Sequence, residues 1–387
     1  PTTTATTPPG AVPPPTDPPT HLHALSPHDT RNLRILGRTD GRTTGPLPLH
    51  WTCSGFELDL RGTTLELDLE ADYEDLEPWI ELSLNGQDIL RMPVQKGRHR
   101  VSLLRGLAPE KPHRIRVLRE SQPMPGDGLC RLLVHAIVHD GELAPLPEPA
   151  CRIEFIGDSL TSAEGAWGCP EDTEWRPHWF AGAKGYPQRT ADRMGAELRV
   201  VSQSGWGVRS GWDNNPECRI PKHYHQVCGV TGARDGGDAP YDFTSWKPDL
   251  VVCALGANDW NALRAETGYT DPVTGTVFRQ DPDDLAPLAD AIGDFLADLR
   301  RHNPDSVLVW LFWAGGEPLL GLIRRAVEAR RAAGDSRCFL EVLPGMRPDG
   351  ARNHPGLASH DRLASILAIR LRRHLQLTPP LRPRAGT

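Results

Sequence analysis

The sequence has 387 residues, a net charge of −7 from 43 basic and 50 acidic side chains, and 38% hydrophobic residues including 11 Trp. This apolar content excludes a wholly disordered chain, and the acidic balance argues against a nucleic-acid partner. No run of about 18 apolar residues exists, so no membrane-spanning helix is predicted, and with no apolar leader visible a cytoplasmic location is favoured slightly over secretion.

The two ends of the chain are predicted to be tails. Residues 1–30 are rich in Pro and Thr and carry few charges. Such a segment buries too little apolar surface to offset the entropy lost on ordering, so we predict a disordered tail. Residues 377–387 are short and contain Pro, and they are predicted to be a second tail.

Residues 31–147 alternate between apolar and polar side chains. Phe56 and Leu58 illustrate the period of two, and the Asn85-Gly86 pair is a strong signal for a tight hairpin. Short strands at this spacing, with almost no helical stretch, predict an antiparallel β-sandwich domain.

Residues 150–376 follow a different pattern, in which apolar runs alternate with segments of helical period. The predicted strands are 153–156, 198–201, 250–255, 307–312 and 339–343. The predicted helices are 187–194, 284–301, 318–333 and 359–375. Alternating strands and helices predict an α/β domain with a parallel sheet covered by helices on both faces.

The first chemical signal is the sequence Gly157-Asp158-Ser159-Leu160, directly after the first of these strands. Ligands of open α/β sheets bind beyond the carboxyl ends of the strands. A helix is expected to begin here, so that its free N–H groups would favour an anion beside Ser159. The alternative is a Ser that only caps a helix.

Two more loops of small residues follow the second and third strands. Gly205 offers a backbone N–H and Asn258 a side-chain amide. With the Ser159 N–H they would make three donors to one oxyanion, each worth about 3 kcal/mol in the transition state. The alternative for each loop is an ordinary glycine turn.

The fourth signal is His354, in the loop before the last helix. Pro355 disfavours helical geometry at the residue before it, so the imidazole can point into a cleft. The alternative is a surface His without a role. A nucleophile, oxyanion donors and a base are nevertheless supplied by four loops at strand ends.

These four blocks, with Ser159, Gly205, Asn258 and His354 in chain order, resemble the SGNH or GDSL hydrolase superfamily. The resemblance implies a three-layer α/β/α fold in which the Ser159 hydroxyl attacks an ester and His354 is the base.

A β-sandwich ahead of such a domain is similar to carbohydrate esterase family two, a group of acetyl esterases acting on plant polysaccharides. Stretches 51–58, 152–158 and 243–249 fit this pattern, and the resemblance covers about residues 35–375. It implies that the sandwich is a jelly roll.

One position departs from the superfamily pattern. Many members carry Asp three residues before the His, where this chain has Ala351, and Asp349 lies two residues further away. The resemblance to family two implies a Ser–His dyad in which a backbone carbonyl orients the ring. Asp349 remains a candidate for that orienting role.

Four neighbours of these blocks are candidates for supporting roles. Asp158 and Asp259 are expected to fix their loops by hydrogen bonds. Trp206 and Trp260 adjoin the oxyanion loops, and each is a candidate for a wall of the substrate site or, alternatively, for a core residue.

Cysteine and histidine spacing allows one further hypothesis. Cys218, His223, His225 and Cys228 have the chemistry of metal ligands but not a standard zinc spacing, so neither a metal nor another cofactor is predicted. A disulfide between Cys218 and Cys228 is left open.

The sequence thus predicts a serine esterase that hydrolyses small acyl esters, acetyl above all, with a small-molecule or polysaccharide ester as its partner. One alternative is an SGNH lipase or thioesterase for longer acyl chains, although the polar loop 206–248 is unlike an apolar lid. The other is a sugar-binding protein without catalysis, against which the four intact blocks argue.

Overall fold

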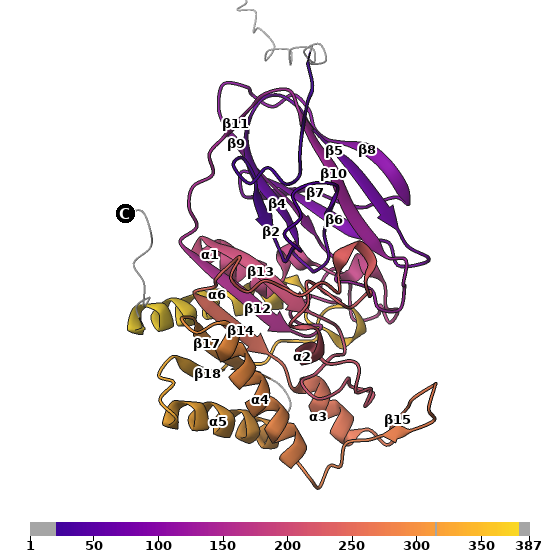
Figure 1. Cartoon of the computed structure of the whole chain (residues 1–387), viewed down its shortest axis with the longest axis vertical. Coiled ribbons are helices and arrows are strands. Elements are labelled where there is room, and N and C mark those ends of the chain that lie inside the picture. Colours follow the sequence, from indigo (N-terminus) through magenta and orange to yellow (C-terminus); the bar gives the residue numbers. More distant parts are fainter. Residues whose placement is uncertain (1–20, 314–315, 379–387) are drawn as a thin grey trace, which may run out of the picture.

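The computed structural model describes residues 21–313 and 316–378, and in the view of Figure 1 two bodies lie one above the other. Most of the two predicted tails lies outside the described residues. The prediction is wrong for part of residues 21–30, because strand β1 (His23–Leu25) pairs with strand β10 (Arg131–His139). The backbone hydrogen bonds of β1 offset the entropy that this segment loses on ordering, and the composition of the segment gives no sign of these bonds.

The upper body in Figure 1 is a sandwich of two antiparallel sheets. Its first sheet has the order β1-β10-β5-β8, with β3 also on β10; the further strands are β3 (Leu47–Pro48), β5 (Leu65–Asp72) and β8 (Gly97–Leu104). Its second sheet has the order β11-β4-β9-β6-β7, with β2 also on β4; its strands are β2 (Arg34–Leu36), β4 (Gly55–Arg61), β6 (Trp79–Leu84), β7 (Gln87–Pro93), β9 (His113–Arg119) and β11 (Glu142–Ala144).

The period of two in the sequence produces the sandwich core. Phe56 and Leu58 on β4 and Leu65 and Leu67 on β5 are all 0% exposed, and they belong to one apolar cluster between the sheets. Alternate residues on each strand therefore point inward, as two packed antiparallel sheets require.

The lower body contains a five-stranded parallel sheet of order β13-β12-β14-β17-β18. Its strands are β12 (Cys151–Gly157), β13 (Ala196–Ser202), β14 (Leu250–Ala254), β17 (Val307–Phe312) and β18 (Cys338–Val342). Its helices are α1 (Tyr186–Met194), α2 (Ile220–His223), α3 (Ala257–Arg264), α4 (Ala286–His302), α5 (Gly316–Ala332) and α6 (Leu357–Leu377). Short 3₁₀ turns lie at Pro177–Trp179, Gly182–Lys184, Arg234–Gly236 and Ala351–Asn353.

Helices cover both faces of this sheet. Helices α1 and α6 pack in one apolar cluster with one face, and α4 and α5 pack in another with the opposite face. The α/β prediction with a three-layer parallel sheet is confirmed, as is the antiparallel sandwich ahead of it. Helix α3 and the small hairpin of β15 (Tyr269–Thr270) and β16 (Val277–Phe278) were not predicted, because both are short.

A buried arginine joins the two bodies. The Arg38 guanidinium, 0% exposed, donates to Glu154 on β12 at 2.9 Å and also to backbone carbonyls of the segment after α2. A buried charge is tolerated only when it is paired and hydrogen-bonded, so this contact fixes the sandwich against the parallel sheet. Among the described residues, no helix combines the length and apolar surface needed to cross a membrane.

Candidate active site

Three of the four predicted blocks begin at one edge of the parallel sheet. In the strand register, Gly157 at the end of β12 pairs with Ser202 on β13 and with Ala254 on β14. The segments that follow these three strands therefore start side by side, and they carry Ser159, Gly205 and Asn258. Because parallel strands have their carboxyl ends on the same side of the sheet, side chains from segments distant in the sequence can meet there.

The structure brings Ser159 and His354 into direct contact. The His354 Nε2 lies 2.9 Å from the Ser159 Oγ, although 195 residues separate them in the chain. Both residues are half-buried, so a small molecule can reach the pair. The predicted nucleophile and the predicted base are thus within hydrogen-bond distance of each other.

The second ring nitrogen of His354 faces a backbone carbonyl. Nδ1 lies 2.9 Å from the oxygen of Arg352, which can only accept, so Nδ1 carries the proton and Nε2 is left with a lone pair toward Ser159. This is the tautomer that a general base needs. An orienting carbonyl is what the resemblance to family two implied, and the structure identifies the residue that carries it as Arg352.

An unusual backbone presents this carbonyl. Arg352 and Asn353 have φ of 54° and 60°, in the left-handed region that costs non-glycine residues about 1 kcal/mol or more each. The Arg352 Nη1 lies 2.9 Å from Oε1 of Glu164, whose side chain is 4% exposed. The other oxygen of Glu164 lies 3.9 Å from the His354 Nε2.

Glu164 was missed by sequence reasoning. It lies five residues after Ser159 but has no recognisable motif, and its partner Arg352 is 188 residues away. The neighbouring Gly165 has φ of 75°, and a Cβ there would lie 2.4 Å from the Ala351 oxygen and 2.8 Å from the His354 Cβ. Only glycine fits this approach of the two loops.

Asp349 does not contact the His354 ring. Its carboxylate accepts the Gly356 N–H at 2.6 Å and the Ser359 hydroxyl at 3.2 Å, both at the start of α6. The candidate orienting role of Asp349 is therefore corrected: it holds the first turn of the helix, where a negative charge is favourable.

The expected helix after Ser159 is absent, which corrects the predicted origin of the oxyanion site. Residues 158–168 form successive turns, because Ala163 has φ of 54° and Gly165 is also left-handed, which ends any helix within one turn. The predicted oxyanion donor of this segment is therefore an individual N–H group and not a helix terminus.

The three predicted oxyanion donors differ in the structure. Among the described residues, neither the Ser159 N–H nor the Gly205 N–H has an acceptor, so both are available to a ligand. The Asn258 amide nitrogen already donates to the Trp206 oxygen at 3.0 Å and to the Asp158 carboxylate at 3.3 Å. Asn258 must exchange one of these bonds to bind an oxyanion.

Two buried carboxylates hold loops at the site, as predicted for Asp158, whereas Asp259 lies on helix α3 and holds the loop after β13 and not its own segment. Asp158 accepts the Leu160 N–H at 3.1 Å. Burial raises the pKa of its carboxyl to about 7, although this hydrogen bond acts to lower the pKa. Asp259 accepts three successive backbone N–H groups of residues 208–210. Burial raises the pKa of Asp259 to about 6, and those three bonds oppose the shift.

The tryptophans are arranged differently from the prediction. The Trp206 side chain is 6% exposed and packs in the core with its ring 4.8 Å from that of His223, so it forms no wall of the site. Trp260 is half-buried on α3, and its role stays a prediction. The exposed indole beside Gly205 is Trp212, which is 59% exposed. Adjacency in the sequence favoured Trp206, whereas Trp212 reaches Gly205 only because the chain turns back and the Trp212 N–H donates to the Gly205 carbonyl at 2.9 Å.

The Cys–His set singled out in the sequence does not assemble. Cys218 and Cys228 are free thiols, and Cys228 is fully buried in the core. Among the described residues, these two with His223 and His225 do not form a group whose ligand atoms lie together. The disulfide left open between Cys218 and Cys228 is not formed.

Known proteins resemble this chain over nearly its whole length. No family model matches it. The structure of Est2A, an acetyl xylan esterase from the rumen bacterium Butyrivibrio proteoclasticus, has a TM-score of 0.87 at 33% identity and covers 92% of this chain and 99% of that one. A family two carbohydrate esterase from Clostridium thermocellum, solved with cellohexaose, shares the fold with a TM-score of 0.74 at 22% identity, covering 89% of this chain and 99% of that one.

Curated relatives are more distant in sequence. The acetylxylan esterase / glucomannan deacetylase of Cellvibrio japonicus is 22% identical over 362 residues, which is 91% of each protein. The cellulase/esterase CelE of Acetivibrio thermocellus is 24% identical over 359 residues, 90% of this chain, and the chain spans 40% of the length of that protein.

A parallel α/β/α sheet with a Ser–His pair beyond its strand ends defines the class of SGNH-type hydrolases. The similarity to Est2A over almost the full length then settles the family. The chain belongs to carbohydrate esterase family two and is a carboxylic ester hydrolase.

Proposed function

We propose that the protein removes acetyl groups from a carbohydrate, with Ser159 as nucleophile and His354 as general base. The observation that carries this proposal is the chain of contacts from the Arg352 carbonyl through the His354 ring to the Ser159 hydroxyl, at 2.9 Å each. The names of the relatives support the acetyl group and the carbohydrate as substrate class.

The reaction proceeds in two halves at Ser159. Its Oγ attacks the ester carbonyl while His354 Nε2 accepts the hydroxyl proton, and the carbonyl oxygen becomes an oxyanion that takes the free N–H groups of Ser159 and Gly205. His354 then gives the proton to the leaving sugar oxygen as its bond to the acyl carbon breaks, and an acetyl-enzyme remains. Water attacks this ester while His354 accepts its proton, and His354 returns the proton to the Ser159 Oγ as acetate leaves.

Two groups stabilise the positive charge that His354 carries after it accepts the proton. The Arg352 carbonyl accepts from Nδ1, and the Glu164 carboxylate lies 3.9 Å from Nε2. A negative group near the imidazolium favours the charged form that exists only after proton transfer. We propose that this pairing does the work that an Asp performs in a triad.

Ser159→Ala tests the assignment. It should lower release of 4-nitrophenol from 4-nitrophenyl acetate, and of acetate from acetylated xylan or glucomannan, by roughly three orders of magnitude or more. Ser245→Ala, on an exposed turn before β14, is the control and should keep wild-type activity. Activity retained by Ser159→Ala contradicts the nucleophile. A wild-type preference for 4-nitrophenyl octanoate over the acetate would favour the long-chain alternative.

A further inference from the structure

Two imidazoles and a carboxylate meet on the far side of the parallel sheet from α1 and α6. They belong to His225, in the segment after α2, and to Asp298 and His302 on α4, and one ligand atom of each lies within 4.8 Å of the others. The His225 Nε2 is 2.8 Å from Asp298 Oδ2, and the His302 Nε2 is 3.5 Å from Asp298 Oδ1. None of these residues takes part in the proposed reaction.

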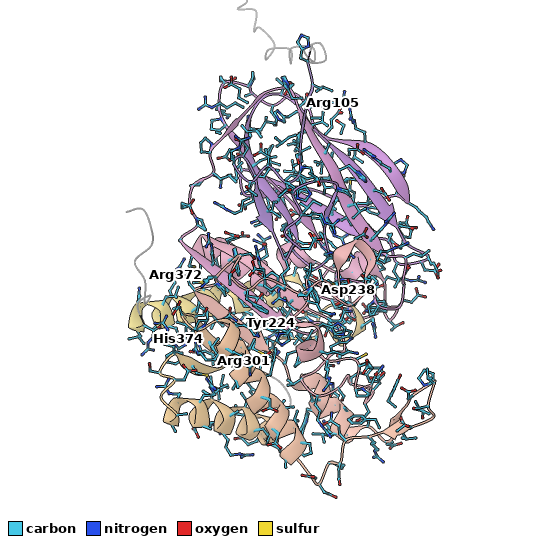
Figure 2. All side chains as sticks on the ribbon, in the orientation of Figure 1. Arg105, Tyr224, Asp238, Arg301, Arg372 and His374 are labelled. Atoms are coloured by element: carbon cyan, nitrogen blue, oxygen red, sulfur yellow. The ribbon has the colours of Figure 1, made fainter. Side chains whose placement is uncertain are left out.

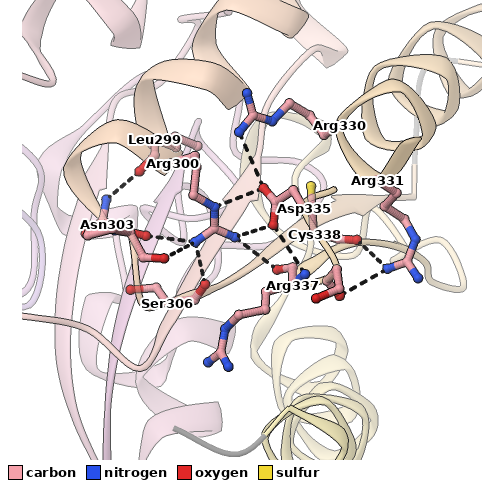
Figure 3. Close-up of polar contacts among 11 residues, drawn as sticks. Leu299, Arg300, Asn303, Ser306, Arg330, Arg331, Asp335, Arg337 and Cys338 are labelled. Carbon is pink, nitrogen blue, oxygen red and sulfur yellow. Dashed lines mark hydrogen bonds and ion pairs between the residues drawn. The ribbon is translucent and has the colours of Figure 1, made fainter. Parts of the chain in front are cut away.

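The last turns of α4 are a rigid platform for two of these groups. Asp298 and His302 are four residues apart, so both side chains lie on one face of the helix. Arg300 binds Asp335 through Nε at 2.9 Å and the Ser306 carbonyl through Nη1 at 2.7 Å, and it fixes the helix end from another side (Figure 3).

The third group, His225, is brought in by its own segment. The His225 carbonyl accepts the Tyr241 N–H at 2.8 Å, and this hydrogen bond joins the two ends of the loop between residues 225 and 241. The ring of Phe243 stacks on His302 with centroids 4.1 Å apart and limits its rotation. Tyr224 and Arg301, the neighbours of two ligand residues, are labelled in Figure 2 near the end of α4.

This donor set suits a divalent ion of the zinc type. Zn²⁺ binds imidazole nitrogen at about 2.0–2.1 Å and carboxylate oxygen at about 2.0–2.2 Å, so tetrahedral ligand atoms lie about 3.3 Å apart. The His225 nitrogen lies 2.8 Å from one Asp298 oxygen and the His302 nitrogen 3.5 Å from the other, and one ligand atom of each residue lies within 4.8 Å of the others, so the set is close to the spacing that one ion needs. His225 is 46% exposed, which leaves the fourth position open to water.

Arg301 is the competitor for this site. Its Nη1 lies 2.7 Å from Asp298 Oδ1, but its side chain is 67% exposed. An ion pair this exposed contributes little to stability, so the guanidinium can move into solvent when a cation takes the carboxylate.

We propose that His225, Asp298 and His302 bind one Zn²⁺ ion and that the ion fastens the segment between β13 and β14 to α4. This segment also carries Gly205 and Trp212, and the carbonyls of Tyr224 and Gln226 in it hold Arg38 of the sandwich. The ion thus stabilises the loop of the proposed oxyanion site and the contact between the two bodies, without touching the reacting atoms.

A similar cluster with a single imidazole provides the control. In the sandwich, His135 Nε2 lies 2.8 Å from one oxygen of Glu70, and Arg131 pairs with the other oxygen. It repeats the carboxylate, the imidazole and the competing arginine but lacks the second imidazole. This cluster offers one protein ligand fewer than the proposed site, so we expect it to bind Zn²⁺ more weakly.

The test is a Zn²⁺ titration of the untagged protein against a chromophoric indicator, with melting followed in parallel. We expect one ion per chain, a melting temperature that rises with Zn²⁺, and affinity that falls at least about tenfold in His225→Gln and in His302→Gln. His135→Gln should bind as wild type does, and Arg301→Gln should bind several-fold more tightly.

Two results would overturn the proposal: no saturable Zn²⁺ binding by the wild type up to about 100 μM, or His225→Gln and His302→Gln proteins that bind as the wild type does. The Arg301→Gln variant keeps the test valid if a histidine variant misfolds, because it retains all three ligands. Weaker Zn²⁺ binding in Arg301→Gln than in the wild type would count against the site, since removing a competing cation should not weaken the binding of another.

Discussion

The loops that carry Ser159 and His354 are held in place in different ways. Neighbours in sequence close the Ser159 turn: the Ser162 N–H donates to the Asp158 carbonyl at 3.0 Å, and the Leu160 N–H to the Asp158 carboxylate at 3.1 Å. The loop around His354 instead depends on segments from the other end of the α/β domain.

Those distant partners offset the strain of the His354 loop. The Arg352 side chain pairs with Glu164, and the Ala351 N–H donates to the Gly165 carbonyl at 2.9 Å. Two consecutive left-handed residues persist only where the surroundings fix them in this way. The position of the nucleophile is thus encoded in its own motif, whereas the direction of the base is encoded in the pairing of two remote segments.

Removing the imidazole should have the largest effect. His354→Ala leaves the Ser159 hydroxyl without a proton acceptor, and we expect kcat for 4-nitrophenyl acetate to fall by roughly three orders of magnitude or more. His99→Ala, an exposed histidine of the sandwich, is the control. Near-normal activity in His354→Ala would show that another group acts as base.

Glu164→Gln tests the long-range support of the base. Glutamine can still accept from Arg352 but carries no charge, so the hydrogen bond weakens and the imidazolium loses a nearby anion. We expect kcat to fall by about tenfold, or ~1.4 kcal/mol, with little change in KM for a small ester. Kinetics with 4-nitrophenyl acetate separate the two constants.

The control for Glu164→Gln is Glu66→Gln. Glu66 also pairs with an arginine, Arg105, at 3.2 Å, but the pair lies on the sandwich and not in the α/β domain. It should leave kcat and KM unchanged. An equal loss of kcat in both variants, or a change confined to KM for Glu164→Gln, would contradict a positioning role for Glu164.

The same contrast explains which parts of the molecule were predictable from the sequence. Period-two and helical patterns are local, so they predicted the sandwich and the parallel sheet, and short motifs after the strands predicted the four blocks. Strand β1 and the role of Glu164 depend on partners more than a hundred residues away, and no local pattern carries them. Likewise adjacency to Gly205 favoured Trp206 over Trp212 as a wall of the site, and only packing decides that the first is buried and the second exposed.

Asp158 on the nucleophile side makes stability depend on pH. Its carboxyl has a pKa raised to about 7 by burial. The folded protein therefore keeps a proton that the unfolded chain releases, and this stability is complete below about pH 4 and is lost as pH rises through about 7. Asp158→Asn cannot titrate, so the fall in stability between pH 5 and 8 should be less steep, by up to about 1.4 kcal/mol per pH unit.

Urea unfolding at several pH values measures this slope. Absolute stability of Asp158→Asn will also drop, because the new amide faces the donating amide of Asn258, so only the slope is compared. Asp283→Asn, at an exposed position, should keep the wild-type slope. Identical slopes in the wild type and Asp158→Asn would mean that Asp158 is ionised throughout this range.

Asp349→Ala should have the smallest effect and separates a triad from a dyad. If Asp349 oriented the imidazole, its loss would lower kcat by about 10⁴-fold. Loss of the Asp has this effect in a protease triad, because the His then adopts the wrong tautomer. The Arg352 carbonyl already holds Nδ1, and Asp349 holds the start of α6. We therefore expect a loss of about 1 kcal/mol in unfolding free energy and a change in kcat of no more than a few-fold. Urea unfolding and 4-nitrophenyl acetate kinetics on one preparation measure both, and a thousand-fold fall in kcat with unchanged stability would restore Asp349 to the catalytic group.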